Sequence, residues 1–221
     1  MKHPFIIQDL IAEANNRNNL LPAEYLLVLQ PHEALGTEIK SIKEKFATDY
    51  SCDQARKGLP HITLAVFKQY QATENRIRQL LRNNARTLSS FKIEMKGFGS
   101  FPSHTIYIDI VSKVPIMNAV KTLRQQAQKF MKPDKDNKPF FITEPHLTIA
   151  RKLLPWQYEQ GWLDYSHRHF TGRFIANDML LLKRPLEFLA DGSHRTGKYQ
   201  IVQRFEFMNL PVSTRQGELF M

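Results

Sequence analysis

Two short stretches of this 221-residue chain are nearly the same: KGLPHITLAVF at 57–67 and ITEPHLTIARK at 142–152. Each contains a proline, a histidine, an aliphatic residue, a threonine and a second aliphatic residue, in that order. Alternation of polar and aliphatic residues is typical of a β-strand with one buried face. In such strands His61 and Thr63 point to one side, and so do His146 and Thr148. We therefore expect two strands that each carry an imidazole and a hydroxyl on one face.

The segments around the two copies share an order of elements. Around the first copy the apolar patterns predict, in turn, a strand, a helix, the motif strand, a helix and a strand, at 24–31, 32–50, 61–67, 73–88 and 91–101. Around the second copy the same order is predicted at 104–111, 115–131, 146–151, 155–165 and 168–185, followed by a further strand within 198–210. The repeated order indicates a duplicated α+β unit.

We predict a single domain over 1–221, with an α+β fold that is a pseudo-symmetric two-lobed duplication. The lobes are expected over about 24–101 and 104–210, and an exchange of elements between them is left open. Each lobe is expected to be an antiparallel sheet backed by helices, with a cleft between the sheets where the two polar faces meet. Apolar residues make up 42% of the chain and charged residues 24%, which is ordinary for a globular protein that buries a core.

Two imidazoles and two hydroxyls around one space suit in-line attack at a phosphodiester. A neutral histidine takes a proton from the attacking water or hydroxyl, and a protonated histidine gives one to the leaving oxygen. The ordinary imidazole pKa, about 6.5, allows both forms near neutral pH. Thr63 and Thr148 are expected to donate hydrogen bonds to the non-bridging oxygens. We therefore expect His61, Thr63, His146 and Thr148 to be catalytic, with neither a metal nor a cofactor.

The charge and the remaining composition limit the partners. The chain has 31 Lys and Arg against 21 Asp and Glu, a net charge of +10, which favours anionic partners such as an RNA end or a nucleotide cyclic phosphate. Cys52 is the only cysteine, so no internal disulfide is expected. No signal-peptide pattern and no apolar run of about 20 residues is present. We expect a cytoplasmic protein without a membrane partner, and a monomer because the repeats already form an internal pair.

Three segments of the sequence also resemble those of a known family. PHITLAVF, PHLTIARK and the segment GFGSFPSHTIYIDI (97–110) resemble the signatures of the two-histidine (2H) phosphoesterase superfamily. Within it they are most similar to the bacterial 2′-5′ RNA ligase, or RNA 2′,3′-cyclic phosphodiesterase, group, over about Tyr25 to Phe207. This resemblance implies metal-free hydrolysis of a 2′,3′-cyclic phosphate to a 2′-phosphate, reversible as 2′-5′ ligation. It leaves open a small-nucleotide substrate, such as cyclic ADP-ribose phosphate or 2′-5′ oligonucleotides. A non-catalytic RNA-binding protein is the alternative from another class.

Several other residues are candidates for substrate binding. Arg151 follows the second motif and could clamp a phosphate, although strict alternation places it opposite His146 unless a bulge intervenes. Phe67 is expected on the His61 face, lining the cleft. Tyr107 and Phe98 could stack on a base, and packing in the core is the alternative for each aromatic ring.

Two further groups of residues have partial resemblance to binding sites, one for a metal and one for a phosphate. His167 and His169 lack a third metal ligand and are expected to be solvated. The segment GSHRTGK (192–198) does not complete the phosphate-binding loop pattern. It is expected to be a basic hairpin turn, with the RNA backbone as its candidate partner.

Overall fold

The structure is a computed structural model that describes residues 21–188 and 194–208. Its elements follow the predicted order. The first repeat consists of β1 (Pro22–Leu29), α2 (Glu33–Asp49), β2 (Ile62–Tyr70), α3 (Glu74–Arg86) and β3 (Phe91–Phe101). The second consists of β4 (Thr105–Ile110), α4 (Lys113–Ala127), β6 (His146–Arg151), α5 (Pro155–Tyr165) and β7 (Thr171–Ala176). The other described elements are β5 (Phe140–Phe141), β8 (Asp178–Phe188), β9 (His194–Thr196), β10 (Gln200–Glu206) and the 3-10 helices η1 (Gln71–Thr73) and η2 (Gln128–Phe130).

The described strands form one antiparallel sheet. Their order is β10-β8-β1-β2-β6-β4-β3-β7, with β5 paired to β2 and β9 paired to β8. The two motif strands, β2 and β6, are neighbours that pair antiparallel at Ile62 and Leu147. The predicted α+β fold is therefore confirmed, and the two expected sheets are two arms of one sheet that join at the motifs.

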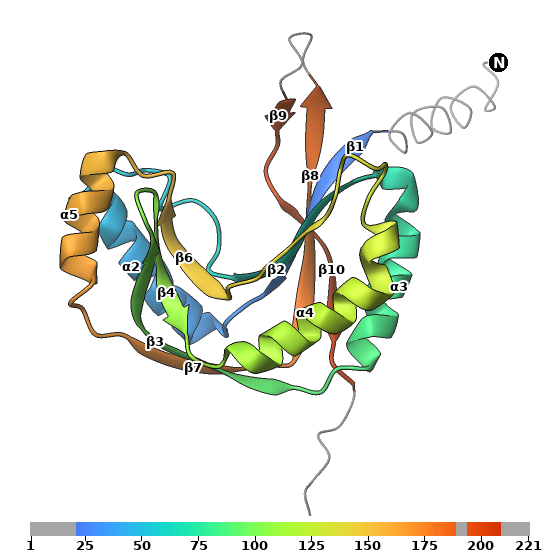
Figure 1. Cartoon of the computed structure of the whole chain (residues 1–221), viewed down its shortest axis with the longest axis horizontal. Helices are drawn as coiled ribbons and strands as arrows, with labels where there is room; N and C mark the ends of the chain where they lie inside the picture. The colour runs from blue at the N-terminus through green and yellow to red at the C-terminus, as the bar shows by residue number, and fades with distance from the viewer. Residues whose placement is uncertain (1–20, 189–193, 209–221) are drawn as a thin grey trace, which may run out of the picture.

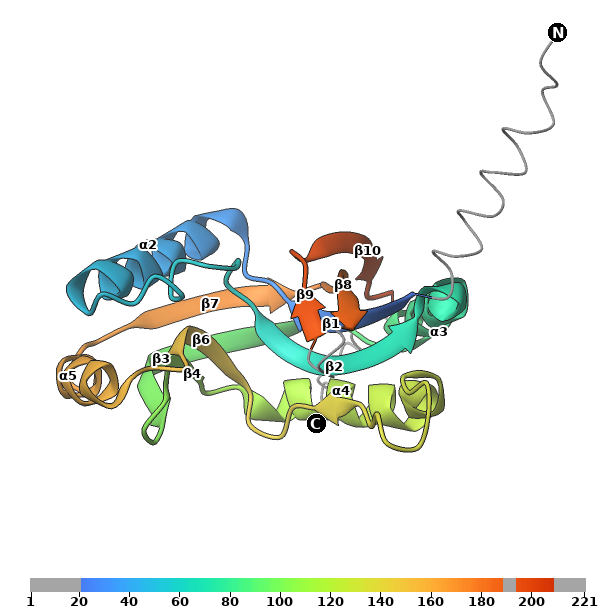
Figure 2. The ribbon, with the colours of Figure 1, turned by 90° about the horizontal axis from the view of Figure 1, so that it is seen from above.

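The sheet curves into a crescent (Figure 1), with the motif strands at its centre. We call β6, β4, β3 and β7 the β6 arm, and β2, β1, β8 and β10 the β2 arm. Helices α2 and α5 pack against the β6 arm, and α3 and α4 pack against the β2 arm (Figure 2). Helix α2 precedes β2 in the chain but lies against β6, and each arm contains strands from both 24–101 and 104–210. The repeats therefore exchange elements.

Close packing of α2 on α5 depends on one glycine. Leu35, Ile39 and Phe46 lie on the buried face of α2, at the three- and four-residue spacings of a helix face. The ring of Phe46 is 5.3 Å from that of Tyr165 in α5. A Cβ atom on Gly161 would lie 2.9 Å from the Phe46 ring. Because this is closer than carbon atoms normally approach, a glycine at 161 allows the two helices to meet.

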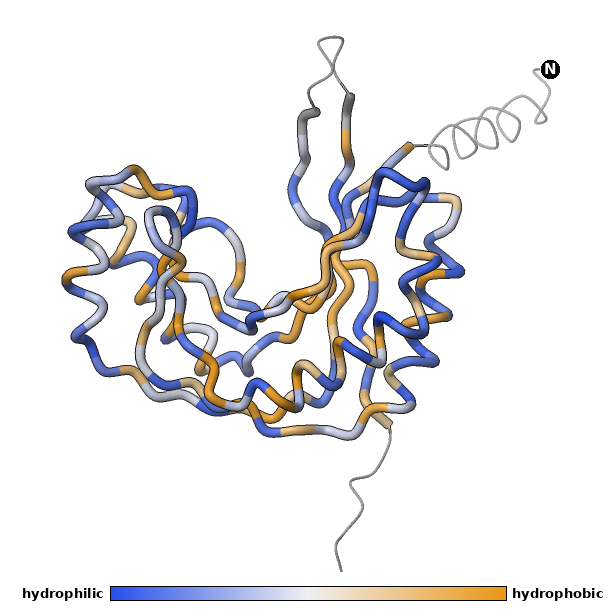
Figure 3. Tube along the Cα trace, in the orientation of Figure 1, coloured by the Kyte–Doolittle hydropathy of each residue, from blue (hydrophilic) through white to orange (hydrophobic). Residues whose placement is uncertain are grey.

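A continuous buried row joins the two arms. Leu29 pairs with Ile62, Ile62 with Leu147, and Leu147 with Ile108. All four side chains are fully buried, and burying each contributes about 1.5–3 kcal/mol. Figure 3 shows a hydrophobic stretch of the trace where β1, β2 and β8 cross. None of the described helices has the length and apolar character needed to cross a membrane.

Replacement of Leu147 by Ala should destabilise the fold, because it leaves a cavity where the arms join. We expect the free energy of unfolding to fall by roughly 2–5 kcal/mol, as measured by urea denaturation. Leu163→Ala on α5 is the matched control, since Leu163 is 67% exposed and its loss should change stability by less than about 0.5 kcal/mol. Equal effects of the two substitutions would contradict the importance of the junction.

Candidate active site

Both motif strands contain a β-bulge at the residue after the threonine. On β2, Val28 of β1 pairs with Thr63 and Leu27 with Ala65, so that Leu64 is the extra residue. On β6, Tyr107 of β4 pairs with Thr148 and Ile106 with Ala150. Ile149 is therefore the extra residue there. A bulge shifts the alternation of faces by one residue. In both strands the alternation therefore shifts after the threonine, so that the alanine two residues later turns into the core and the residue after it returns to the face that carries His and Thr.

The bulged strands place the two histidines and two threonines on one face of the sheet. Ile62 and Leu147 pair directly and point into the core. One step to either side, antiparallel pairing sets His61 across from Thr148 and Thr63 across from His146. Residues directly across from one another have Cβ atoms about 4.5–5.5 Å apart, and diagonal pairs are about 7–8 Å apart. The two imidazoles are therefore diagonal neighbours above a shared space.

Each imidazole is held by the same local hydrogen bond. His61 Nδ1 lies 2.7 Å from the carbonyl oxygen of Leu59, and His146 Nδ1 lies 2.7 Å from that of Glu144. A carbonyl oxygen only accepts, so Nδ1 carries the hydrogen and donates it. In a neutral ring held this way Nε2 carries the lone pair, which a general base requires, and in a protonated ring Nε2 carries the proton that a general acid gives.

The surroundings of the two histidines differ in charge. Burial lowers the pKa of His61, the Leu59 carbonyl opposes this, and the charges of Lys43, Arg151 and His146 lower the pKa further. Burial also lowers the pKa of His146, but there the carbonyl and the carboxylate of Glu144 both oppose the effect. Cations therefore surround His61, whereas an acidic side chain accompanies His146.

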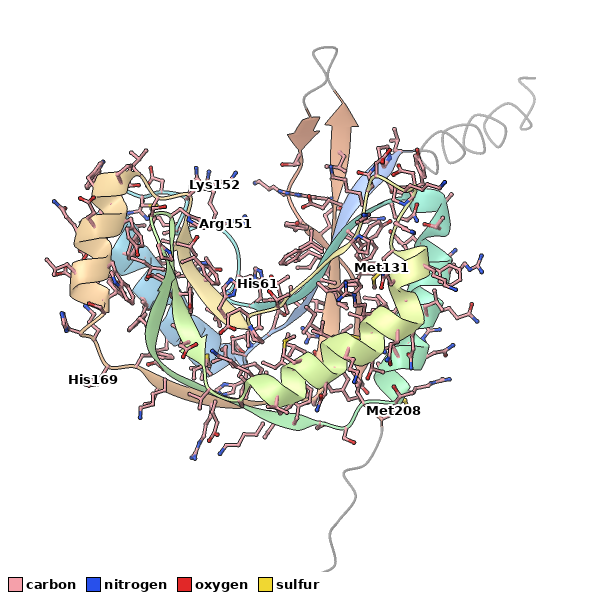
Figure 4. All side chains as sticks on the ribbon, viewed as in Figure 1. His61, Met131, Arg151, Lys152, His169 and Met208 are labelled. Atoms are coloured by element: carbon pink, nitrogen blue, oxygen red, sulfur yellow. The ribbon has the colours of Figure 1, made fainter. Side chains whose placement is uncertain are left out.

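Arg151 lies on the site face as a consequence of the second bulge. It pairs with Thr105 at the end of β6, after the shift at Ile149, which removes the objection from strict alternation. Its side chain is exposed and near enough to His61 to lower its pKa. Figure 4 shows both residues on the inner side of the crescent. Among residues 21–188 and 194–208, no carboxylate forms an ion pair with Arg151, so its guanidinium is available to an anion.

Tyr107 lies beside the second histidine. It pairs with Thr148, and its ring centroid is 5.1 Å from that of His146 and 4.8 Å from that of Phe101. Gly99 makes room for it, because a Cβ atom there would lie 2.5–2.8 Å from the Tyr107 ring. Phe98 instead packs edge-on against Tyr165, 4.9 Å away between ring centroids, on the core side. Tyr107 is thus placed at the site and Phe98 is not.

The expectation that Phe67 shares a face with His61 is wrong. The bulge at Leu64 turns the rest of β2 over, so that Phe67 pairs with Tyr25. The two rings stack with centroids 5.2 Å apart, and Phe67 is 2% exposed within the core. It therefore cannot line the site.

Phe140 lies on the site face of the sheet, and the sequence reasoning missed it. It pairs with Val66, which packs with Leu26 and Val28, and Val28 pairs with Thr63. Cross-strand partners share a face, so Phe140 lies on the same face as the threonine. Phe140 is 56% exposed, whereas Phe141 is buried. The signal in the sequence is the pair of phenylalanines at 140–141, which in a strand must point to opposite sides.

Lys43 is a second residue that was missed. Its side chain is buried on α2 among the apolar positions, and its charge acts on His61. The signal was present, because Lys43 lies four residues after Ile39 and three before Phe46, within the helical stripe that faces the core.

The other residues weighed from the sequence lie apart from this site. His167 and His169 are exposed, and Figure 4 shows His169 on the outer side of the crescent. Within the described ranges, no group of three His, Cys, Asp or Glu side chains could hold a metal ion. Cys52 is buried. Part of the 192–198 segment lies outside the described residues. A cavity of about 670 Å³ is lined by the start of α2 with β3 and β7, and none of the site residues borders it.

The fold and the paired motifs define a two-histidine phosphoesterase. The family model of the 2′-5′ RNA ligase superfamily matches residues 31–186, and the chain belongs to this superfamily. Escherichia coli LigT in complex with 3′-AMP is similar in fold, with a TM-score of 0.55 and 16% identity over 85% of this chain and 99% of that one. TT0787 of Thermus thermophilus has a TM-score of 0.52 and 15% identity over 84% and 98% of the two chains. Among curated proteins, none matches the chain.

Titration of His61 and His146 tests the electrostatic surroundings described for the two rings. Because burial lowers both pKa values, the imidazole Hε1 resonances of His61 and His146 should titrate with midpoints below 6.5, measured by NMR. In the urea-denatured chain, the control, all histidines should titrate near about 6.5. A site midpoint above that of the denatured chain would contradict the electrostatic description.

Proposed function

We propose that the protein is a metal-independent phosphodiesterase that hydrolyses nucleoside or RNA 2′,3′-cyclic phosphates to 2′-phosphomonoesters. The observation that carries the proposal is the equivalent hydrogen bonding of His61 and His146. Both Nδ1 atoms donate to a backbone carbonyl, so Nε2 is the atom of each ring that can take up or release a proton, and the rings are diagonal neighbours on one face. Two equivalent proton carriers of this kind match the two proton transfers of phosphodiester hydrolysis.

The reaction follows from the positions of these groups. One neutral imidazole removes a proton from water as the water oxygen bonds to phosphorus. The bond from phosphorus to the 3′-oxygen breaks, and the other, protonated imidazole gives that oxygen a proton. The 2′-phosphate remains as product, and the roles of the two histidines exchange in the reverse, 2′-5′ ligating direction. Thr63 and Thr148 donate hydrogen bonds to the non-bridging oxygens, where the transition state concentrates charge.

The substrate is held by charge and by aromatic surface. The Arg151 guanidinium is on the site face and can hold a phosphate oxygen pair. Tyr107 and Phe140 lie on opposite arms, on either side of the histidine pair, and each offers a ring to a base. LigT, similar in fold, has been observed with 3′-AMP, which supports a nucleotide as the ligand of this face.

Replacement of either His61 or His146 by Ala should abolish turnover of a 2′,3′-cyclic mononucleotide. Each proton transfer contributes about 10²–10⁴ in rate, and the double variant should lose little more than one single variant because the pair acts as a unit. The assay measures monophosphate formation with a chelator present. His169→Ala, which changes an exposed histidine away from the site, is the control. Full activity in either single variant, or loss of wild-type activity with the chelator, would refute the mechanism.

Phe140→Ala should weaken substrate binding without impairing the chemical step. Loss of one stacked base costs roughly 5- to 100-fold in affinity, so KM for an oligonucleotide with a 2′,3′-cyclic end should rise while kcat changes little. Ile201→Ala removes another exposed hydrophobic side chain, 68% exposed on β10, and should leave KM unchanged. An unchanged KM in Phe140→Ala would remove this residue from the binding site.

A further inference from the structure

Lys43 is a charged residue on the otherwise apolar buried face of α2. Lys43 is 6% exposed, and its Nζ donates hydrogen bonds to the carbonyl oxygens of Lys57 at 3.2 Å and Gly58 at 3.0 Å. Within the described part of the chain, no carboxylate lies within ion-pair distance of this ammonium. Burying a charge without a counter-ion is costly, and an apolar residue would fill this position at lower cost. The charge itself is therefore the feature to be explained.

The two carbonyl groups that Lys43 holds lead directly to the first histidine. They belong to the end of the loop between α2 and β2, where Gly58 has a φ of +80°, a left-handed conformation that favours glycine. The next residue is Leu59, whose carbonyl oxygen accepts the Nδ1 hydrogen of His61. Lys43 therefore holds the two peptide groups that immediately precede the one whose carbonyl orients the His61 ring.

The second histidine has a corresponding support with the opposite electrical character. Its supporting carbonyl belongs to Glu144, and the Glu144 side chain is bound by Lys113 at the start of α4. Lys113 also lies 3.5 Å from Asp109. In both repeats a lysine from the helix before the motif strand thus binds the segment that leads into the histidine, at Lys57 and Gly58 in the first and at Glu144 in the second. Lys113 is neutralised by carboxylates, whereas Lys43 is not.

We propose that Lys43 is a positioning residue that orients His61 through the 57–59 loop, and that its positive charge biases His61 toward the base role. The base role rests on the proposed function, whereas the orientation of the ring does not. The charged groups that act on His61 are Lys43 from α2 and Arg151 and His146 from β6, and all of these disfavour a proton on His61. Glu144 acts on His146 in the opposite sense, so a single proton shared by the pair resides on His146.

Lys43 loses its proton within an accessible pH range, so the proposal can be tested in the wild-type protein. Burial, with a further contribution from the Arg151 charge, lowers the pKa of Lys43 to about 8. Above that pH the ammonium loses its charge and one of its three N–H donors. The NMR resonance of His61 Hε1 should therefore show a second inflection near pH 8, which Lys43→Arg should abolish because arginine stays charged.

Substitution by an apolar residue of similar length separates the charge from simple packing. In Lys43→Met the titration midpoint of His61 should rise, because one cation is lost, while that of His146 stays unchanged. The kcat for a 2′,3′-cyclic mononucleotide should fall roughly 10- to 100-fold through misplacement of the ring, with little change in KM. Lys40→Met, on the exposed side of the same helix, is the matched control and should alter none of these quantities.

The possible results distinguish a failure of the role of Lys43 from a failure of the proposed function. An unchanged or lowered His61 midpoint in Lys43→Met overturns the proposal, as does a wild-type His61 resonance that is flat near pH 8. Should Lys43→Met fail to fold, the comparison of the wild type with Lys43→Arg still decides. The NMR readouts need no substrate. A His61 shift without phosphodiesterase activity would thus refute the proposed function alone, and activity without the shift would refute the role of Lys43 alone.

Discussion

The pairing of Ile62 with Leu147 is the constraint on which the site depends. It joins the two arms into one sheet and buries a row of aliphatic side chains beneath the junction. Because side chains alternate along a strand, fixing this pair on the core side places both histidines and both threonines on the opposite side. The geometry of the candidate active site is thus a consequence of core packing. A shift of register by one residue would turn the whole set into the core.

The two β-bulges shift the alternation of faces at the same position in each repeat. Without them, Ala65 and Phe67 would share the face of His61, and Arg151 would point away from His146. A bulge is fixed by the pairing with a neighbouring strand, which the local sequence does not determine. For this reason the alternation in HITLAVF predicted the motif face correctly but failed two residues later. The same feature that removes Phe67 from the site brings Arg151 into it.

The order of the elements and their types followed from hydrophobic periodicity, and α5 and β6 were predicted with the bounds observed. The exchange of helices between arms could not be predicted, because it depends on which strands lie side by side across more than a hundred residues. Phe140 and Lys43 were missed for a related reason. Phe140 belongs to a strand of two residues, which only the adjacent phenylalanines mark. Lys43 lies within the buried stripe of its helix, but no sequence pattern marks the loop carbonyls that it binds.

We propose that the near-symmetry of the backbone and the asymmetry of the charges give the two histidines different tasks. Equivalent hydrogen bonds orient both rings, whereas the charges of Lys43 and Arg151 lower the pKa of His61 and the carboxylate of Glu144 opposes the lowering of the pKa of His146. The central claim is that both imidazoles act on one phosphate. A crystal structure with a nucleoside 2′-monophosphate bound tests it most directly. The account predicts both Nε2 atoms within hydrogen-bond distance, about 2.7–3.2 Å, of oxygens on the same phosphate. A phosphate that contacts one imidazole or neither would contradict it.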